Sequence, residues 1–228
     1  MVAVTLGNGG RANSGSPGTR SKMIAMLRGE LLKAQVYDAE KGTDLRMEAF
    51  KAVLDGDMRL LVTVERSYDI LTTLRLAEEF GIDLVLDSAS EAYLVTDQIK
   101  AAGVSVITHA TMARHGGERA NATFEAAAIL RDAGIPFALQ SGFEAYVPKT
   151  RVILFEAGVA AANGLSFEEA LASITIDAAR LLGVDHRIGS LEVGKDADIA
   201  LYDGDPFEYT THAIGVIIDG NVVSTEVR

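Results

Sequence analysis

Hydrophobic residues fall in short runs that alternate with amphipathic stretches along most of the chain. The run LLVTV over residues 60–64 contains strand formers, and the stretch after it places Ile70, Leu74 and Ala77 on one helical stripe. We expect this helix to end at Gly81, because glycine readily adopts the left-handed conformation that closes a helix. The pattern therefore predicts one strand followed by one helix.

The same strand and helix unit repeats three more times. Further strands are predicted over 82–87, 104–108 and 137–140, and further helices over 91–102, 124–133 and 150–162. The strands are apolar along their whole length, which predicts a parallel sheet with both faces covered and with right-handed helical crossovers. Two of the units end alike, in DSASEAY (87–93) and QSGFEAY (140–146), which suggests a shared turn geometry.

Segments outside these units set the expected domain boundaries. Residues 1–20 are rich in Gly and Ser and are predicted to be a loop or tail. Two helices are expected between 21 and 54, and a third starts at Ser166 with Glu169 in a capping box and continues to residue 182. Short strands with Asp-Gly turns occupy 188–228, so we divide the chain into 1–20, 21–187 and 188–228.

Composition narrows the class of protein. The net charge of −11 disfavours a nucleic-acid partner, and the absence of cysteine excludes disulfides and thiolate metal ligands. No apolar run reaches the roughly 18 residues of a membrane span, and the first residues lack the pattern of a secretory signal. We therefore expect a soluble, cytoplasmic protein without a membrane partner.

The C-terminal stretch carries a family resemblance. AARLLGVDHRIGSLEVGKDADIALYDGDPFEYTTHAIGVIIDGNVV (178–223) closely resembles the C-terminal signature of the amidohydrolase superfamily, especially its imidazolonepropionase-like members. The units from Arg59 to Pro148 resemble the later barrel strands of the same family. The resemblance implies an α/β fold: part of a (β/α)8 barrel of about four βα units, followed by a small β segment of a composite β-sandwich domain.

The resemblance also implies a chemistry. Family members hydrolyse non-peptide C–N bonds in cyclic amides and related small molecules, with one or two divalent metals such as zinc that activate water. Their ligands are a His-x-His on the first strand, a His on each of strands five and six, and an Asp on strand eight. Here the corresponding later strands end in Val62-Thr63-Val64-Glu65, Asp87-Ser88 and Ser141-Gly142. The sequence therefore predicts that no metal is bound by this chain and that the chain is inactive alone.

Three residues are candidates for catalysis. Glu65 and Asp87 stand at the ends of predicted strands, where sites in barrels cluster. They could be an acid and a base or a makeshift cation site, or instead a helix-capping carboxylate and a solvated one. His109 ends the third predicted strand and could form hydrogen bonds in a site. The spacing of His109 and His115 does not preorganise a metal pair.

Four residues are candidates for binding a small-molecule ligand: Arg66, Ser88, His109 and Ser141. Arg66 could hold a substrate carboxylate through two hydrogen bonds or could pair with a glutamate for structure. An alternative function is a non-catalytic binding or interaction subunit. Because an incomplete barrel leaves open sheet edges, we expect a homo-oligomer or a complementing N-terminal half.

Overall fold

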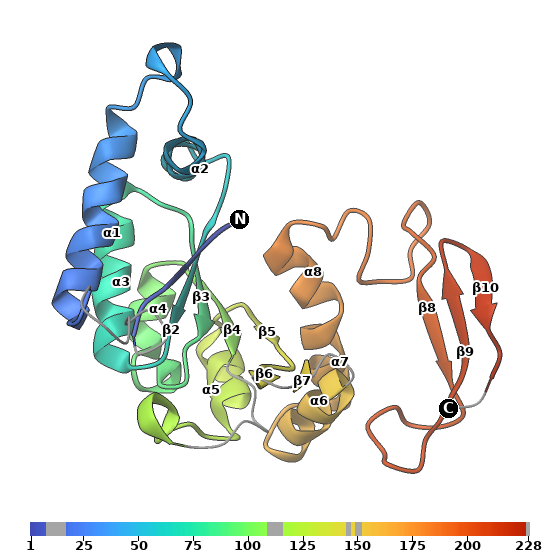
Figure 1. Ribbon diagram of the computed structural model, residues 1–228. Helices are drawn as coiled ribbons and strands as arrows, with labels where there is room; N and C mark the ends of the chain where they lie inside the picture. The colour runs from blue at the N-terminus through green and yellow to red at the C-terminus, as the bar shows by residue number, and fades with distance from the viewer. Residues whose placement is uncertain (8–16, 109–115, 145–146, 149–151, 227–228) are drawn as a thin grey trace. The chain divides into compact units, whose positions relative to one another are not determined.

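The computed structural model describes residues 1–7, 17–108, 116–144, 147–148 and 152–226 (Figure 1). These residues form two compact units, which divide between Ile135 and Pro136. The division lies earlier in the chain than the boundary at 187 and 188 that the sequence suggested. His109 and His115 lie outside the described residues.

Parallel strands form the centre of the first unit. They are β1 (Val2–Thr5), β2 (Leu60–Val64), β3 (Leu84–Ser88) and β4 (Ser105–Thr108), and they lie in the order β1-β2-β3-β4. All pairs between β1 and β4 are parallel and in register, with Val64 opposite Ser88 and Ser88 opposite Thr108. This sheet is the part of a barrel that the strand and helix repeat predicted.

β1 corrects the prediction for the first residues. Residues 1–20 were expected to be a loop or tail, but Val2–Thr5 pair with β2 through backbone bonds such as Val2 N to Arg59 O at 2.9 Å. The glycine-rich composition that gave the prediction begins only at Gly7, and the short apolar run before it is enough for an edge strand.

Helices connect the strands of the first unit. The α-helices are α1 (Arg20–Gln35), α2 (Leu45–Leu54), α3 (Ser67–Phe80), α4 (Thr96–Ala101) and α5 (Ala126–Ala133), and the 3-10 helices are η2 (Ala39–Lys41), η3 (Ala92–Leu94) and η4 (Gly117–Arg119). α3 ends at Gly81, whose φ of 66° is left-handed, as predicted. The single helix predicted over 91–102 is wrong, because Val95, at φ −136° and ψ 33°, is outside the helical region and separates η3 from α4.

The core lies around β3. Leu84, Val85 and Leu86 are all at most 2% exposed, so this strand is covered on both faces as predicted. β2 instead alternates, with Leu60, Val62 and Val64 buried and the two residues between them partly exposed. The prediction of full cover is therefore wrong for β2, which is nearer to the edge strand β1.

The described residues place β5 (Phe137–Leu139), three α-helices and two small sheets in the second unit. Its further elements are β6 (Phe143–Glu144), β7 (Val147–Pro148), α6 (Ile153–Ala162), α7 (Phe167–Ile174), α8 (Ile176–Leu182), β8 (Ile199–Tyr202), β9 (Ala213–Ile218) and β10 (Asn221–Ser224). The capping box of Ser166 and Glu169 is confirmed. The continuous helix predicted after it is wrong, because Thr175 leaves the helical region at φ −125° and ψ −97° and separates α7 from α8.

β8, β9 and β10 form an antiparallel sheet. Asp219 and Gly220, with φ of 50° and 75°, make the tight turn between β9 and β10, as the Asp-Gly pattern predicted. Large apolar side chains of this sheet remain exposed, among them Leu201 at 47% and Val222 at 66%. Within the described part of the chain, no helix is both long and apolar enough to cross a membrane.

Candidate functional site

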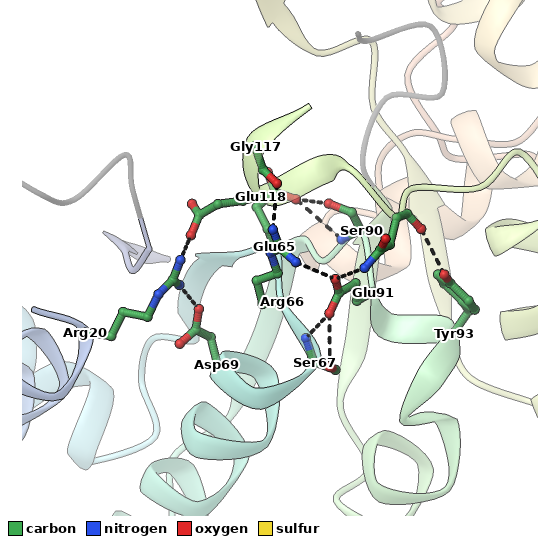
Figure 2. A network of polar contacts seen from close by, with 11 residues as sticks. Arg20, Glu65, Arg66, Ser67, Asp69, Ser90, Glu91, Tyr93, Gly117 and Glu118 are labelled. Carbon is green, nitrogen blue, oxygen red and sulfur yellow. Dashed lines mark hydrogen bonds and ion pairs between the residues drawn. The ribbon is translucent and has the colours of Figure 1, made fainter. Parts of the chain in front are cut away.

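The candidate site is a network of charged side chains at the carboxyl ends of β2 and β3 (Figure 2). Glu65 and Arg66 follow β2 directly, Ser88 ends β3, and Ser90 and Glu91 follow it. Parallel strands bring their carboxyl ends to one edge, which is where sites in barrels are found. A loop of residues 116–121, which includes η4, contributes the remaining partners.

Glu65 is a buried carboxylate, 8% exposed, with donors on both oxygens. Its Oε1 accepts hydrogen bonds from Ser88 Oγ at 2.9 Å and from Arg119 Nε at 3.0 Å. Its Oε2 accepts from the hydroxyl and the backbone N–H of Ser90. Because both oxygens are occupied by donors, Glu65 is poorly placed to take a proton from water.

Glu91 is buried more deeply, at 3% exposed, and holds three segments together. One oxygen accepts from the backbone N–H of Ser67 at 2.8 Å and from its hydroxyl at 3.0 Å. The other accepts from Asn121 Nδ2 at 2.8 Å and from Arg66 Nη1 at 3.3 Å. Ser67 is the first residue of α3, so Glu91 caps that helix from a distant part of the sequence, where Arg66 itself makes no side-chain cap.

Arg66 is largely engaged within the protein. Besides its bond to Glu91, its Nη2 donates to the carbonyl oxygen of Gly117 at 2.6 Å (Figure 2). Its Nε is buried and has no hydrogen-bond partner among the described residues. This geometry matches the structural Arg-Glu pair, with Glu91 rather than Glu65 as the partner.

A second group of charges surrounds Arg20 at the start of α1. The guanidinium of Arg20 forms ion pairs with both Asp69 of α3 and Glu118 of η4, and it lies over the ring of Tyr68, 5.2 Å from the centroid. Both carboxylates are nearly buried, with side chains 10% and 11% exposed. Gly7 packs against the same glutamate, because a Cβ atom at this position would lie 2.8 Å from Glu118 Oε2.

The pKa values of Asp69 and Glu91 are shifted in opposite directions. Burial raises the pKa of Asp69, and Glu118 adds to this, while Arg20 opposes it. For Glu91, burial also acts to raise the pKa, but hydrogen bonds from Ser67 and Asn121 and the charge of Arg66 outweigh it, so its pKa is lowered. Glu91 is therefore held as an anion, whereas ionised Asp69 is disfavoured by its surroundings.

The turn after β3 is left-handed at two residues that are not glycine, Ser88 at φ 69° and Ala89 at φ 44°. It directs Ser88 and Ser90 toward Glu65. In the repeated pattern, Ala89 of DSASEAY matches Gly142 of QSGFEAY, which is also left-handed at φ 70°. The shared turn geometry that the sequence suggested is thus present at this position.

We expect Ala89→Gly to change the free energy of unfolding by less than about 1 kcal/mol, because relief of the left-handed strain, about 1–2 kcal/mol, offsets the lost methyl burial and the added chain entropy. The matched control is Ala127→Gly in α5, which is similarly buried but helical and should lose about 1–2 kcal/mol. Urea unfolding of both variants gives the comparison. Equal losses would show that the turn at Ala89 carries no strain.

The network includes three of the residues predicted from the sequence, Glu65, Arg66 and Ser88. Asp87 lies one residue before Ser88 and accepts a hydrogen bond from Thr63 Oγ1 at 2.6 Å. Ser141 follows β5 in the second unit and does not belong to the network. The roles proposed for His109 fall on a residue outside the described part of the chain.

Sequence reasoning missed Glu91, Arg119 and Asn121. Glu91 was inside a predicted helix, where a charged residue is ordinary, and only its place in the repeated EAY pattern set it apart. Arg119 and Asn121 lie in a loop without periodicity, and their partners are more than 25 residues away in the sequence. Nothing in the local pattern indicates such contacts.

The described strand ends do not fit a catalytic metal. Across the residues that the structure describes, no three His, Cys, Asp or Glu side chains lie close enough to hold an ion. The nearest carboxylate to the end of β2, that of Glu65, already pairs with Arg119. A catalytic zinc site needs three protein ligands and an open position, and this donor set supplies one carboxylate and two hydroxyls.

Comparison with known proteins identifies the family of this chain. A model of the amidohydrolase family matches residues 87–224. The chain belongs to this family. Its sequence is imidazolonepropionase-like: it is 40% identical over 76 residues to the imidazolonepropionase of Shewanella sp. (strain MR-4), and 38% identical over 84 residues to that of Syntrophobacter fumaroxidans.

Solved structures of amidohydrolases share the fold. An amidohydrolase from Thermotoga maritima MSB8 superposes with a TM-score of 0.92 at 28% identity, over 98% of this chain and 62% of that one. An adenosine deaminase from Xanthomonas campestris, solved with bound zinc, superposes with a TM-score of 0.57 at 18% identity, over 96% of this chain and 59% of that one. The fold class expected from the sequence is confirmed.

The chain covers only part of these relatives. The matched segment is 33% of this chain and 19% of the Shewanella protein, and for the Syntrophobacter protein the shares are 36% and 20%. In the superpositions, the chain spans less than two thirds of either solved relative.

Proposed function

We propose that this chain is part of a hydrolase of non-peptide C–N bonds, of the kind found in cyclic amides and related small molecules, and that it is inactive alone. Membership of the amidohydrolase family and the similarity to imidazolonepropionases support the reaction class. The choice of substrate rests on that similarity alone, so imidazolone propionate is the first compound to test.

The observation that carries the second part of the proposal is the Arg119–Glu65 ion pair at the end of β2. Hydrolysis in this family depends on a divalent metal that activates water. At this strand end a guanidinium is paired with the carboxylate, and both hydroxyls of the turn, Ser88 and Ser90, donate to it as well. The residues described here can bind and orient polar groups, but they do not assemble a site that makes hydroxide.

An activity assay tests this proposal. The purified chain, with and without added Zn²⁺, is incubated with imidazolone propionate and a panel of other cyclic amides, and ring opening is followed by absorbance. A Shewanella imidazolonepropionase is the positive control. We expect no turnover above the uncatalysed rate, and zinc-dependent turnover by this chain alone would contradict the proposal.

A second candidate function is that of a non-catalytic subunit that completes a barrel with another chain. Among the strands that the structure describes, β1 ends its sheet, and the backbone groups on the open side of such a strand need a partner strand or another cover. The β8–β10 sheet also exposes apolar side chains, including Ile218 at 52% and Val223 at 54%. A second copy of this chain or a separate N-terminal half would cover these surfaces.

Light scattering after size exclusion tests the need for such a partner. We expect the purified chain to elute with a mass above that of a single chain, or to aggregate unless it is co-expressed with an N-terminal amidohydrolase fragment such as that of the Thermotoga relative. A monodisperse, cooperatively folded monomer would contradict this second proposal and leave the first untouched.

A further inference from the structure

The Arg119–Glu65 pair has the geometry of an internal counter-ion. We infer that Arg119 replaces a metal ion at the carboxyl end of β2, so that Glu65 is no metal ligand in this chain, and that removing the guanidinium exposes a site for a hard divalent cation. This inference goes beyond the proposed function, because it concerns which positive charge neutralises Glu65, whatever reaction the assembled protein performs.

Arg119 is the counter-ion of the Glu65 carboxylate. Glu65 is 8% exposed, and a carboxylate at this depth needs a cation or several strong donors. Among the described residues, its salt bridge comes from Arg119 alone, at 3.0 Å from Nε to Oε1. Two further arginines in the described part of the network are committed elsewhere, since Arg66 binds Glu91 and Arg20 binds Asp69 and Glu118.

The position of the Arg119 guanidinium restricts where a metal ion could bind Glu65. A divalent cation bound to Glu65 would lie roughly 2.0–2.6 Å from a carboxylate oxygen. The guanidinium already contacts Oε1, and arginine does not lose its proton in proteins, so the two cations would compete for one carboxylate. Binding of a metal at Oε1 therefore requires that Arg119 leave, and Oε2 already accepts hydrogen bonds from the hydroxyl and the backbone N–H of Ser90.

Arg119 covers a set of oxygen donors from Glu65 and the turn after β3. Without the guanidinium, the two oxygens of Glu65 would remain beside the hydroxyls of Ser88 and Ser90. The turn that carries these serines is fixed to β2 by backbone bonds from Ala89 N to Val64 O at 2.6 Å and from Glu91 N to Glu65 O at 2.9 Å. A fixed set of oxygen donors suits Mg²⁺, Mn²⁺ or Ca²⁺ rather than the nitrogen- and sulfur-preferring Zn²⁺.

The test compares wild type, Arg119→Gln, Glu65→Gln and the double variant after treatment with chelator, by thermal unfolding with and without millimolar Mn²⁺. We expect no effect of Mn²⁺ on wild type. Arg119→Gln should lower the melting temperature by roughly 1–3 °C, a small loss because the Arg119 side chain is 41% exposed and solvent screens its pair with Glu65, and Mn²⁺ should recover most of the loss. The double variant should have a melting temperature close to that of wild type, and Mn²⁺ should not change it. Arg180→Gln, which breaks an exposed pair with Asp177, is the control and should change nothing.

Two results would overturn the inference. One is a rise in the melting temperature of wild type with Mn²⁺ that Glu65→Gln abolishes, because Glu65 would then be a ligand beside Arg119. The other is an Arg119→Gln variant that Mn²⁺ does not rescue, which would make Arg119 a packing residue only. If Arg119→Gln does not fold, metal content of purified wild type and Glu65→Gln still decides: equal content supports the inference, and a loss in Glu65→Gln contradicts it.

Discussion

Glu91→Ala is expected to reduce the free energy of unfolding by about 3 kcal/mol, because it removes a buried anion and leaves the cation of Arg66 and the first N–H of α3 without their partner. Chemical denaturation at neutral pH measures the loss. The matched control is Glu78→Ala, an exposed glutamate in the last turn of the same helix, which should change stability by less than about 0.5 kcal/mol.

The pH dependence of this loss has a definite sign. The pKa of Glu91 is lower in the folded protein than in the unfolded chain, so its contribution is present above the unfolded carboxyl pKa and disappears as the pH falls through the folded value. The difference between wild type and Glu91→Ala should therefore be largest near neutral pH and should shrink in acid. A loss that is independent of pH would mean that packing, not charge, gives Glu91 its effect.

Arg20→Met is expected to cost about 2 kcal/mol at neutral pH, because Asp69 and Glu118 would then face each other without the cation between them. The pKa of Asp69 is already raised by burial, and loss of Arg20 removes the main opposing cause, so it should rise further. A raised pKa means that stability is retained below the unfolded carboxyl pKa and is lost as the pH rises through the folded value. The deficit of the variant should thus be larger near pH 7 than at about pH 4.5.

Arg28→Met provides the control for Arg20. Arg28 lies on the same helix and pairs with Glu79, but both side chains are more than 40% exposed, so its replacement should have little effect at any pH. Equal losses in the two variants, or a deficit of Arg20→Met that grows in acid, would contradict the role given to Arg20.

The repeating strand and helix pattern was sufficient to predict most of the first unit. Runs of strand formers and glycine stops depend on neighbours close in the sequence, and β2 and α3 begin and end where those signals lie. The two broken helices were not predictable in the same way. Val95 and Thr175 are β-branched residues that a helical stripe tolerates, and the backbone leaves the helix there only in the folded chain.

The site was predictable only in part, for a related reason. Position at a strand end indicated Glu65, Arg66 and Ser88, because the sheet topology alone brings them to one edge. Which of them pair, and with what, depends on Glu91 and on the loop of residues 116–121, whose contacts join distant segments. The sequence therefore located the edge but left Arg66 open between a ligand and a structural pair with a glutamate, and the structure pairs it with Glu91 and Gly117.

The close approach of Gly7 to Glu118 bears on how freely the N-terminal region can vary. Any side chain at residue 7 would meet the Glu118 carboxylate and would also have to adopt the left-handed φ of 94°. A saturation library should consequently accept few replacements there, while Gly29 in α1, with no atom within 4 Å of its would-be Cβ, should accept many. Two glycines of similar appearance in the sequence would then have opposite mutational tolerance.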